Sequence, residues 1–246
     1  MPGIDTMDGL MRAVAEFDTD GFELTVTAAA LERARRSIDE SGLLLLGEVH
    51  GIRENPLVVL GLMRVLELGS LALEWPEDLA PQLDLYLTRG GELDHALWWL
   101  GDGRVTAGHL AVLKAMAGVR VTLFDGGMFT GDWSQRDANM ARRLLEVHAE
   151  PMLVVAGNAH ARTSPTDLGL PMGACLASAR PALESVRIDY GTGSLYNFEP
   201  RFVRGYCAGA GLRVAEDESL VVGLPEFSEA AVPHLPVDLL RERLGP

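Results

Sequence analysis

Glu48 and His50 follow a run of four leucines, and this pair is the first candidate for chemistry in the sequence. The leucines, residues 43–46, are typical of a strand that is buried on both faces, as in the centre of a parallel sheet. Gly47 then allows the backbone to turn sharply. Ligands of open α/β sheets bind just beyond the carboxyl ends of the strands. A carboxylate and an imidazole at such an end could take a proton from a small molecule or from water.

A second stretch, far along the chain, repeats this pattern. Residues 152–156 are apolar and are followed by Gly157 and then by His160, so both stretches have the form G-x-x-H. One histidine at a strand end is often a packing residue, but the repetition favours a chemical role. Two parallel strands in the middle of one sheet would bring His50 and His160 together.

Two further acidic residues come directly after predicted strands. Glu74 follows the strand predicted over 70–73, and Asp125 follows the strand predicted over 120–124. Unpaired carboxylates at one sheet edge would be unfavourable without a cation or a protonated histidine between them. A bound metal ion is therefore one alternative.

Two mechanisms would use these residues differently. In the first, His50 is a general base, Glu48 or Glu74 fixes its tautomer, and His160 polarises a carbonyl group or protonates the leaving group. In the second, a divalent metal ion is held by His50, His160 and Glu74, with water in the open position and the remaining glutamate as base. The sequence leaves both open.

Four nearby residues are candidates for substrate binding. Asn158 could donate to an oxyanion, and Arg53 or Arg162 could hold an anionic group. Asp125 is the fourth candidate. Either arginine could equally be an ordinary surface residue.

The elements that must position these residues alternate between residues 27 and 160. The predicted helices cover residues 28–40, 56–68, 81–87, 93–100, 107–117 and 134–149, and the predicted strands cover 43–46, 70–73, 120–124 and 152–156. This alternation predicts a mainly parallel central sheet with helices on both faces. Two later strands, 186–190 and 219–223, either extend the sheet edge or form an antiparallel flap. The glycines of residues 191–194 are interpreted as a turn.

Local signals assign roles to several polar residues on these helices. Thr27 and Asn55 are predicted to cap the helices that follow them. Asp137 is predicted to complete a capping box. His95 and His109 are interpreted as packing residues.

The whole chain is consistent with one α/β domain, with its core at about 27–165 and a C-terminal extension over 166–246. The formal net charge of −14 argues against nucleic acid and anionic membranes as partners. The two cysteines, Cys175 and Cys207, exclude a disulfide scaffold and a zinc ribbon. Without a signal peptide or a membrane-spanning stretch, we expect a bacterial protein that is cytoplasmic.

These motifs resemble the superfamily that joins the erythromycin esterases, the ChaN haem-uptake proteins and the Tiki/TraB proteases. The Gly-Glu-x-His-Gly form of residues 47–51 is similar to the esterase branch. The Asn-Pro pair at 55–56, the Arg-Asp-x-x-Met-Ala segment at 136–141 and the residues 154–162 look more like the ChaN branch. The resemblance covers roughly residues 41–165, in a chain much shorter than typical erythromycin esterases.

The resemblance implies a different role for Glu48, His50, Glu74 and His160 in each branch. The esterase branch implies a histidine that acts as general base without a metal. The Tiki branch implies a divalent metal ion held by the paired histidines and a glutamate. The ChaN branch implies haem or iron binding without turnover, and the tyrosines that could add a ligand there are Tyr190, Tyr196 and Tyr206.

The sequence therefore predicts a hydrolase-like enzyme that acts on an ester, lactone or amide of a small molecule or peptide. The alternative is a ChaN-like protein that binds haem or iron without turnover. Cyclisation or elimination on the same acid–base set is also open, as are a homodimer and the identity of the substrate.

Overall fold

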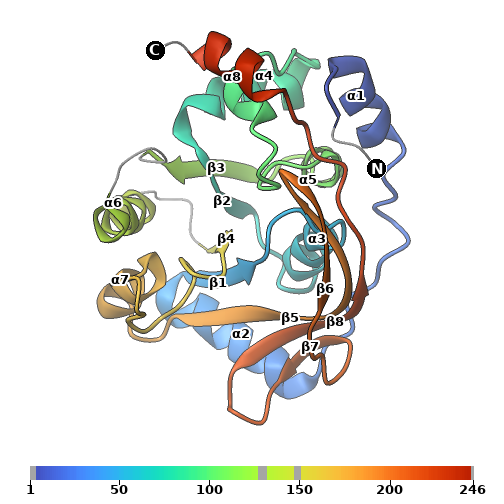
Figure 1. The fold of residues 1–246 in the computed structure, drawn as a ribbon. Helices are drawn as coiled ribbons and strands as arrows, with labels where there is room; N and C mark the ends of the chain where they lie inside the picture. Colours follow the sequence, from blue (N-terminus) through green and yellow to red (C-terminus); the bar gives the residue numbers. More distant parts are fainter. Residues whose placement is uncertain (1–3, 127–131, 147–150, 245–246) are drawn as a thin grey trace.

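The computed structural model describes residues 4–126, 132–146 and 151–244, and its centre is an eight-stranded sheet (Figure 1). The strands are β1 (Leu43–Glu48), β2 (Ser70–Pro76), β3 (Arg120–Asp125), β4 (Met152–Gly157), β5 (Glu184–Asn197), β6 (Glu199–Arg204), β7 (Gly211–Val214) and β8 (Leu220–Phe227). Their order is β3-β2-β4-β1-β5-β8-β7, with β6 paired to β5. All pairings from β3 to β8 are parallel, whereas β6 and β7 run antiparallel to their neighbours. The predicted fold class is confirmed.

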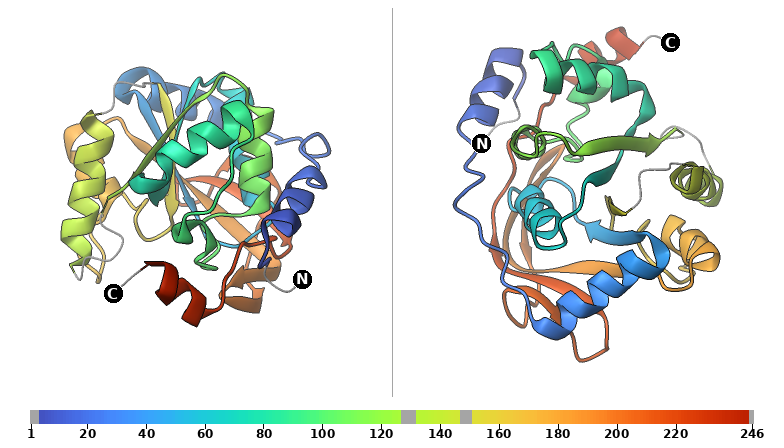
Figure 2. Two further views of the ribbon diagram at one scale, coloured as in Figure 1. Left: turned by 90° about the horizontal axis from the view of Figure 1, so that it is seen from above. Right: turned by 180° about the vertical axis from the view of Figure 1, so that it is seen from behind.

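Helices cover both faces of this sheet, as the alternating pattern predicts (Figure 2). The α-helices are α1 (Met7–Ala15), α2 (Ala28–Ser41), α3 (Asn55–Val65), α4 (Ala80–Arg89), α5 (Ala107–Ala115), α6 (Trp133–Glu146), α7 (Met172–Ala179) and α8 (Val237–Leu244). Two short 3₁₀ helices, η1 (Glu77–Leu79) and η2 (Ala96–Trp99), lie before α4 and α5. One core packs α1 to α5 on one face, and a second packs α6 and α7 on the other.

The leucine run explains why β1 lies in the middle. Leu44 and Leu46 point into the core beneath α3 and α5, whereas Leu43 and Leu45 point into the core beneath α6 and α7. All four side chains are fully buried. Because successive side chains of a strand alternate between faces, an unbroken apolar run requires cover on both.

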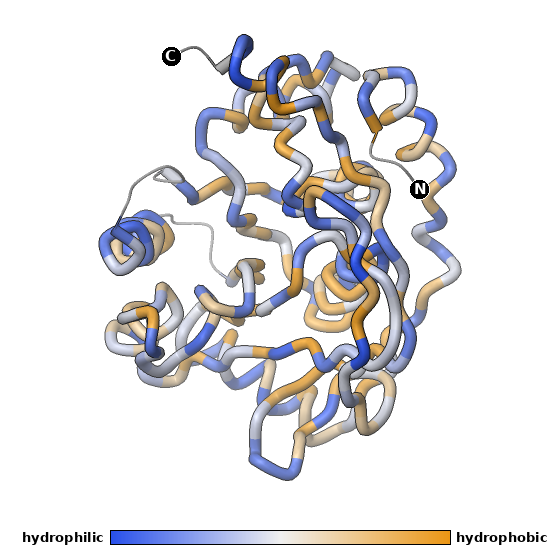
Figure 3. Tube along the Cα trace, viewed as in Figure 1, coloured by the Kyte–Doolittle hydropathy of each residue, from blue (hydrophilic) through white to orange (hydrophobic). Residues whose placement is uncertain are grey.

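The hydropathy of the helices reflects how deeply each one is buried (Figure 3). The helix α3 is hydrophobic nearly all round, and residues 55–63 are all buried, as expected. The helix α6 instead has a hydrophilic outer face. None of the helices in the described part of the chain combines the length and the hydrophobicity needed to cross a lipid bilayer.

Of the two caps predicted for α2 and α3, the first is confirmed and the second is wrong. The Thr27 hydroxyl accepts a hydrogen bond from the Ala30 N–H. Asn55 is not a cap, because it lies inside the first turn of α3. Its buried amide donates to the Val49 carbonyl oxygen at 2.8 Å and accepts from the Tyr190 hydroxyl at 2.9 Å. A tertiary contact thus takes the side chain that the local signal assigned to capping.

The glycines at 191–194 do not form the predicted turn. They lie within β5, which pairs in parallel with both β1 and β8, so the C-terminal strands extend the sheet. A Cβ on Gly191 would lie 2.0 Å from the Pro225 carbonyl oxygen, and one on Gly193 would lie 2.0 Å from that of Phe227. Glycine is required here by the close approach of β8.

Candidate active site

Three buried carboxylates lie at the carboxyl ends of neighbouring strands. Glu48 ends β1, Glu74 lies near the end of β2, and Asp125 ends β3. Their exposed fractions are 4%, 4% and 2%. Because β4 lies between β1 and β2, these ends form one continuous edge of the sheet. The structure thus brings the three predicted carboxylates to one place.

His50 lies just beyond β1 and is bonded to Glu48. Its Nδ1 is 3.2 Å from the Glu48 Oε1 atom. A Cβ on Gly157 would lie 3.3 Å from the His50 Nε2 and 3.5 Å from the Glu74 Oε2, so the imidazole and the Glu74 carboxylate both pack against this glycine. Burial opposes a charged ring, but the hydrogen bond and charge of Glu48, with the charges of Glu74 and Asp102, outweigh it. The pKa of His50 is therefore raised above its usual value.

His160 approaches Glu74 from the other side. Its Nε2 is 3.6 Å from the Glu74 Oε1, and its Nδ1 is 2.7 Å from the Asp137 Oδ1. The Asp137 Oδ2 accepts the Met172 N–H at 2.7 Å, and the Trp133 ring stacks on the imidazole at 5.2 Å. The capping prediction for Asp137 is wrong, because this carboxylate fixes His160 instead.

Arg136 joins the carboxylates to one another. Its guanidinium donates to Asp125 at 3.1 and 2.7 Å and to the Glu74 Oε1 at 2.9 Å. Its Nη1 also lies 3.4 Å from the His160 Nε2. Arg104 adds a second cation, 3.2 Å from Asp125. Burial opposes the charge on Arg136, but its carboxylate partners outweigh it and raise its pKa. Both arginines were missed, since loop and helix arginines carry no local signal of this contact.

The Glu74 carboxylate is bonded to an arginine and to a backbone N–H, and it is not placed with other described residues that could bind a metal ion. The Glu74 Oε1 is bonded to Arg136, and its Oε2 accepts the Gly157 N–H at 2.7 Å. Both oxygens of this predicted metal ligand are therefore engaged. Within residues 4–126, 132–146 and 151–244, no three His, Cys, Asp or Glu side chains form a group that could hold a metal ion. The arrangement suits acid–base chemistry among the residues already present.

His109, which was interpreted as a packing residue, faces Glu48. Its Nε2 is 3.9 Å from the Glu48 Oε2, a buried atom with no hydrogen-bond partner among the described residues. The Thr106 hydroxyl accepts from the His109 N–H at 3.1 Å and lies 2.9 Å from the His109 Nδ1. Burial lowers the pKa of His109. In the tautomer that carries its proton on Nε2, the neutral ring points this N–H towards the Glu48 Oε2, while His50 is bonded to the Oε1 of the same carboxylate.

Leucine at position 109 is expected to lower kcat about tenfold, because a hydrogen bond to a charged group contributes about 1.5–3 kcal/mol. A movement of about 1 Å brings the His109 Nε2 within hydrogen-bonding distance of Glu48. Glutamine keeps a donor there and should stay within about threefold of the native kcat. The melting temperature of each variant reports any loss of packing. Equal losses in both variants would contradict a role for the donor.

The acid–base residues enclose a very small space. It is lined by Glu48, His50, Glu74, Arg104 and His109, with apolar residues of β2 and β4 completing the wall. There is room for about one water molecule. A water in this space would lie beside the imidazole and the carboxylates.

The predicted substrate-binding residues do not all join this site. A Cβ on Gly47 would lie 2.8 Å from the Asn158 Oδ1, which places that amide on the opposite side of the end of β1. Arg162 lines the same separate hollow as Asn158. Arg53 is exposed, and its guanidinium lies over the Phe17 ring at 5.2 Å. Asp125 is at the site, but its oxygens bind the two arginines.

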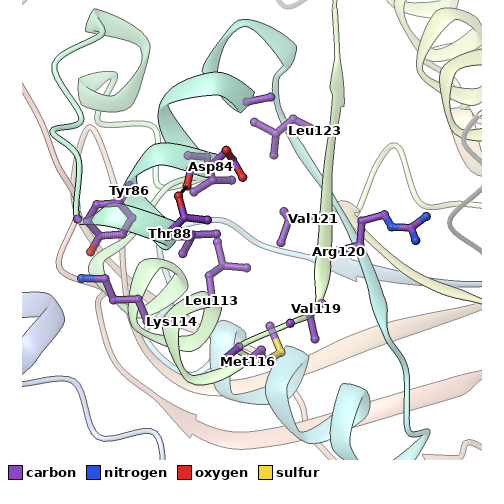
Figure 4. Close-up of a pocket in the computed structure, with 16 residues that line it drawn as sticks. Asp84, Tyr86, Thr88, Leu113, Lys114, Met116, Val119, Arg120, Val121 and Leu123 are labelled. Carbon is purple, nitrogen blue, oxygen red and sulfur yellow. Dashed lines mark hydrogen bonds between the residues drawn. The ribbon is translucent and has the colours of Figure 1, made fainter.

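A larger cavity of about 580 Å³ lies elsewhere, between α4, α5 and β3 (Figure 4). Its wall is mostly apolar and includes Leu113, Val121 and Leu123, with Asp84 and Lys114 at its margin. None of the acid–base residues lines it. Size alone therefore does not identify the candidate active site.

Comparisons with known proteins find similarity in the fold but not in the sequence. No family model and no curated protein matches the chain. A Bacillus cereus protein is similar in structure, with a TM-score of 0.59 and 12% identity over 85% of this chain and 94% of that one. The type III effector HopBA1 has a TM-score of 0.44 and 17% identity, over 86% of this chain and 99% of that one.

The third similar structure is the C-terminal region of Pasteurella multocida toxin, whose report describes a thiol-protease-like catalytic triad. Its TM-score is 0.47 and its identity 14%, over 76% of this chain and 27% of that one. This chain therefore spans about a quarter of that toxin chain. At identities of 12–17%, such similarities concern the fold alone. Only the B. cereus structure, with a TM-score of 0.59, is similar enough among these three to support the fold.

Proposed function

We propose that this protein is a hydrolase that uses His50 as general base on an ester, lactone or amide of a small molecule or peptide. The observation that carries the proposal is the His50–Glu48 hydrogen bond beside an enclosed space of about one water molecule. The resemblance of residues 47–51 to the erythromycin esterases points in the same direction.

The two nitrogen atoms of the His50 ring have different roles in this mechanism. Because Glu48 is an acceptor, the neutral ring carries its proton on Nδ1 and leaves Nε2 free to take a proton from water. Glu48 then stabilises the imidazolium that forms. The raised pKa of His50 brings the base closer to the working pH of a neutral solution.

His160 and Arg136 supply the positive side of the site. Asp137 accepts from the His160 Nδ1, which orients the Nε2 towards Glu74 and the Arg136 guanidinium. In its protonated form His160 would donate from Nε2 to the leaving group or the carbonyl oxygen, and we assign it this role. Fixed donors of this kind stabilise a developing oxyanion because they need no reorganisation.

The metal-assisted alternative can be tested separately. If His50, His160 and Glu74 hold a divalent ion, elemental analysis of the purified protein finds one ion per chain, and alanine at His50 or His160 removes it. The contacts of Glu74 with Arg136 and Gly157 favour the metal-free reaction.

The haem alternative has less support in the contacts. The Tyr190 hydroxyl accepts from the Val49 N–H and donates to Asn55, and the Tyr196 hydroxyl is bonded to His234. Tyr206 is exposed. A Soret shift on adding haem that is lost in His50 or His160 variants would favour binding over turnover.

The pH dependence of turnover tests the His50–Glu48 pair. Turnover needs neutral His50, so kcat/KM should rise with pH through a midpoint above 6.5, the usual value, because the pKa of His50 is raised in the free protein. In Glu48→Gln, burial remains while the charge that opposed it is gone. The midpoint should then fall below that of the native protein, with a lower plateau. Hydrolysis of a 4-nitrophenyl ester from pH 5 to 9 measures both, and an unmoved midpoint would contradict the pairing.

A further inference from the structure

A separate hollow of about 440 Å³ adjoins the candidate active site. Its wall includes Gly47 of β1, Arg187 of β5 and the segment after β4 that carries Asn158 and Arg162. Gly47 precedes Glu48, and the Asn158 N–H donates to the Glu48 carbonyl oxygen at 2.9 Å. The hollow and the acid–base residues therefore lie on opposite sides of the same strand end.

The wall of this hollow is positively charged in a strongly acidic chain. The sequence has 35 acidic and 21 basic residues, yet no carboxylate lines the hollow. Arg187 pairs with Asp189 at 2.8 Å and with Asp217 at 3.6 Å, both outside the wall. Arg162 has no carboxylate partner among the residues that the structure describes.

Arg162 is exposed, and further residues with hydrogen-bond donors line the same hollow. The Asn158 amide and the hydroxyls of Thr163 and Ser164 line the hollow and have no partners within the described ranges. Gly47 lets Asn158 and Ala161 pack closely against the strand, since a Cβ there would lie 2.8 Å from the Asn158 Oδ1 and 3.1 Å from the Ala161 Cβ. Arginine with amide and hydroxyl donors is the set that binds carboxylate and phosphate groups.

We propose that this hollow binds an anionic group, a carboxylate or a phosphate, carried by the substrate of the adjoining acid–base site. The inference rests on the proposed function and narrows its substrate to an anionic ester, lactone or amide. The volume lies within the range of small-molecule sites, about 300–1,000 Å³. The anion would lie beside Gly47 and Arg162, and the scissile bond beside His50, past the carboxyl end of β1.

Binding of inorganic phosphate and of acetate to the full-length protein tests the hollow without any need for turnover. Calorimetry should show saturable binding of at least one of them. Arg162→Met should weaken it at least about tenfold, because a charge-assisted bidentate contact is lost. Arg35→Met is the matched control, since it removes an exposed arginine from α2, and it should change the dissociation constant less than about twofold. Absence of saturable binding, or equal weakening by both substitutions, would overturn the proposal.

A matched pair of substrates then separates this inference from the proposed function. The 4-nitrophenyl half-ester of glutaric acid carries a carboxylate, whereas the 4-nitrophenyl ester of pentanoic acid has the same chain length without it. Arg162→Met should raise KM for the half-ester at least about tenfold and leave KM for the neutral ester unchanged. Equal effects on both esters would overturn the anion site while leaving hydrolysis in place. Retained phosphate binding with no hydrolysis of either ester would reject the proposed function alone.

Discussion

We expect His50→Gln to lower kcat by about 10²- to 10⁴-fold, the range that a positioned general base contributes. Glutamine cannot take a proton from water at neutral pH, but its amide can still donate to Glu48. The His50 side chain is 21% exposed, so its replacement creates no large cavity. The fold should survive, with a melting temperature within about 2 °C of the native value. Ester hydrolysis and a thermal melt of the same preparation measure both quantities.

His234→Gln is the matched control for this substitution. His234 is half-buried and bonded to the Tyr196 hydroxyl at 2.7 Å, outside the acid–base residues. Its replacement should leave kcat within about twofold, because it touches no group that exchanges a proton with substrate. If folded His50→Gln retained kcat to a similar extent, His50 would not be the base.

The positions of Glu48, Glu74 and Asp125 follow from the sequence because each comes after an apolar strand. Parallel neighbours place their carboxyl ends at one edge, so the topology alone collects these side chains. The helix α3 follows equally from its hydrophobicity. Such features depend on periodicity and chain order, which a single sequence contains.

Asp137 and His109 depend instead on contacts between distant elements. Asp137 lies on the apolar stripe of α6, with Met140, Ala141 and Leu144 at helical spacing, and this was the signal that the local capping pattern obscured. A carboxylate on a core face needs a buried partner. His109 likewise lies in a helix whose residues 107–113 are all buried. The sequence marks these residues as unusual but does not identify their partners.

Methionine at position 136 should lower the free energy of unfolding by about 3 kcal/mol at neutral pH. It fills a similar volume but leaves Asp125 and Glu74 without their main cation. Breaking a buried ion pair from one side costs about 3–5 kcal/mol, because an uncompensated charge stays in the interior. The Arg104 guanidinium, 3.2 Å from Asp125, remains and keeps the loss near the lower limit. Urea unfolding of both proteins measures the difference.

Two further variants distinguish a buried charge network from ordinary helix stability. Arg142→Met, on the same helix, removes a side chain that is 64% exposed and pairs with Glu146, so it should cost less than about 0.5 kcal/mol. Adding Asp125→Asn to Arg136→Met removes one of the two carboxylate charges that have lost the Arg136 guanidinium and should recover part of the lost stability. Arg136 also contacts Glu74 and lies beside the His160 Nε2, so kcat should fall in the double variant even where stability returns.

The role of Arg136 would be contradicted if Arg136→Met and Arg142→Met lowered the free energy of unfolding equally. It would also be contradicted if the double variant recovered no stability, because Arg136 would then not hold the carboxylates of the site together.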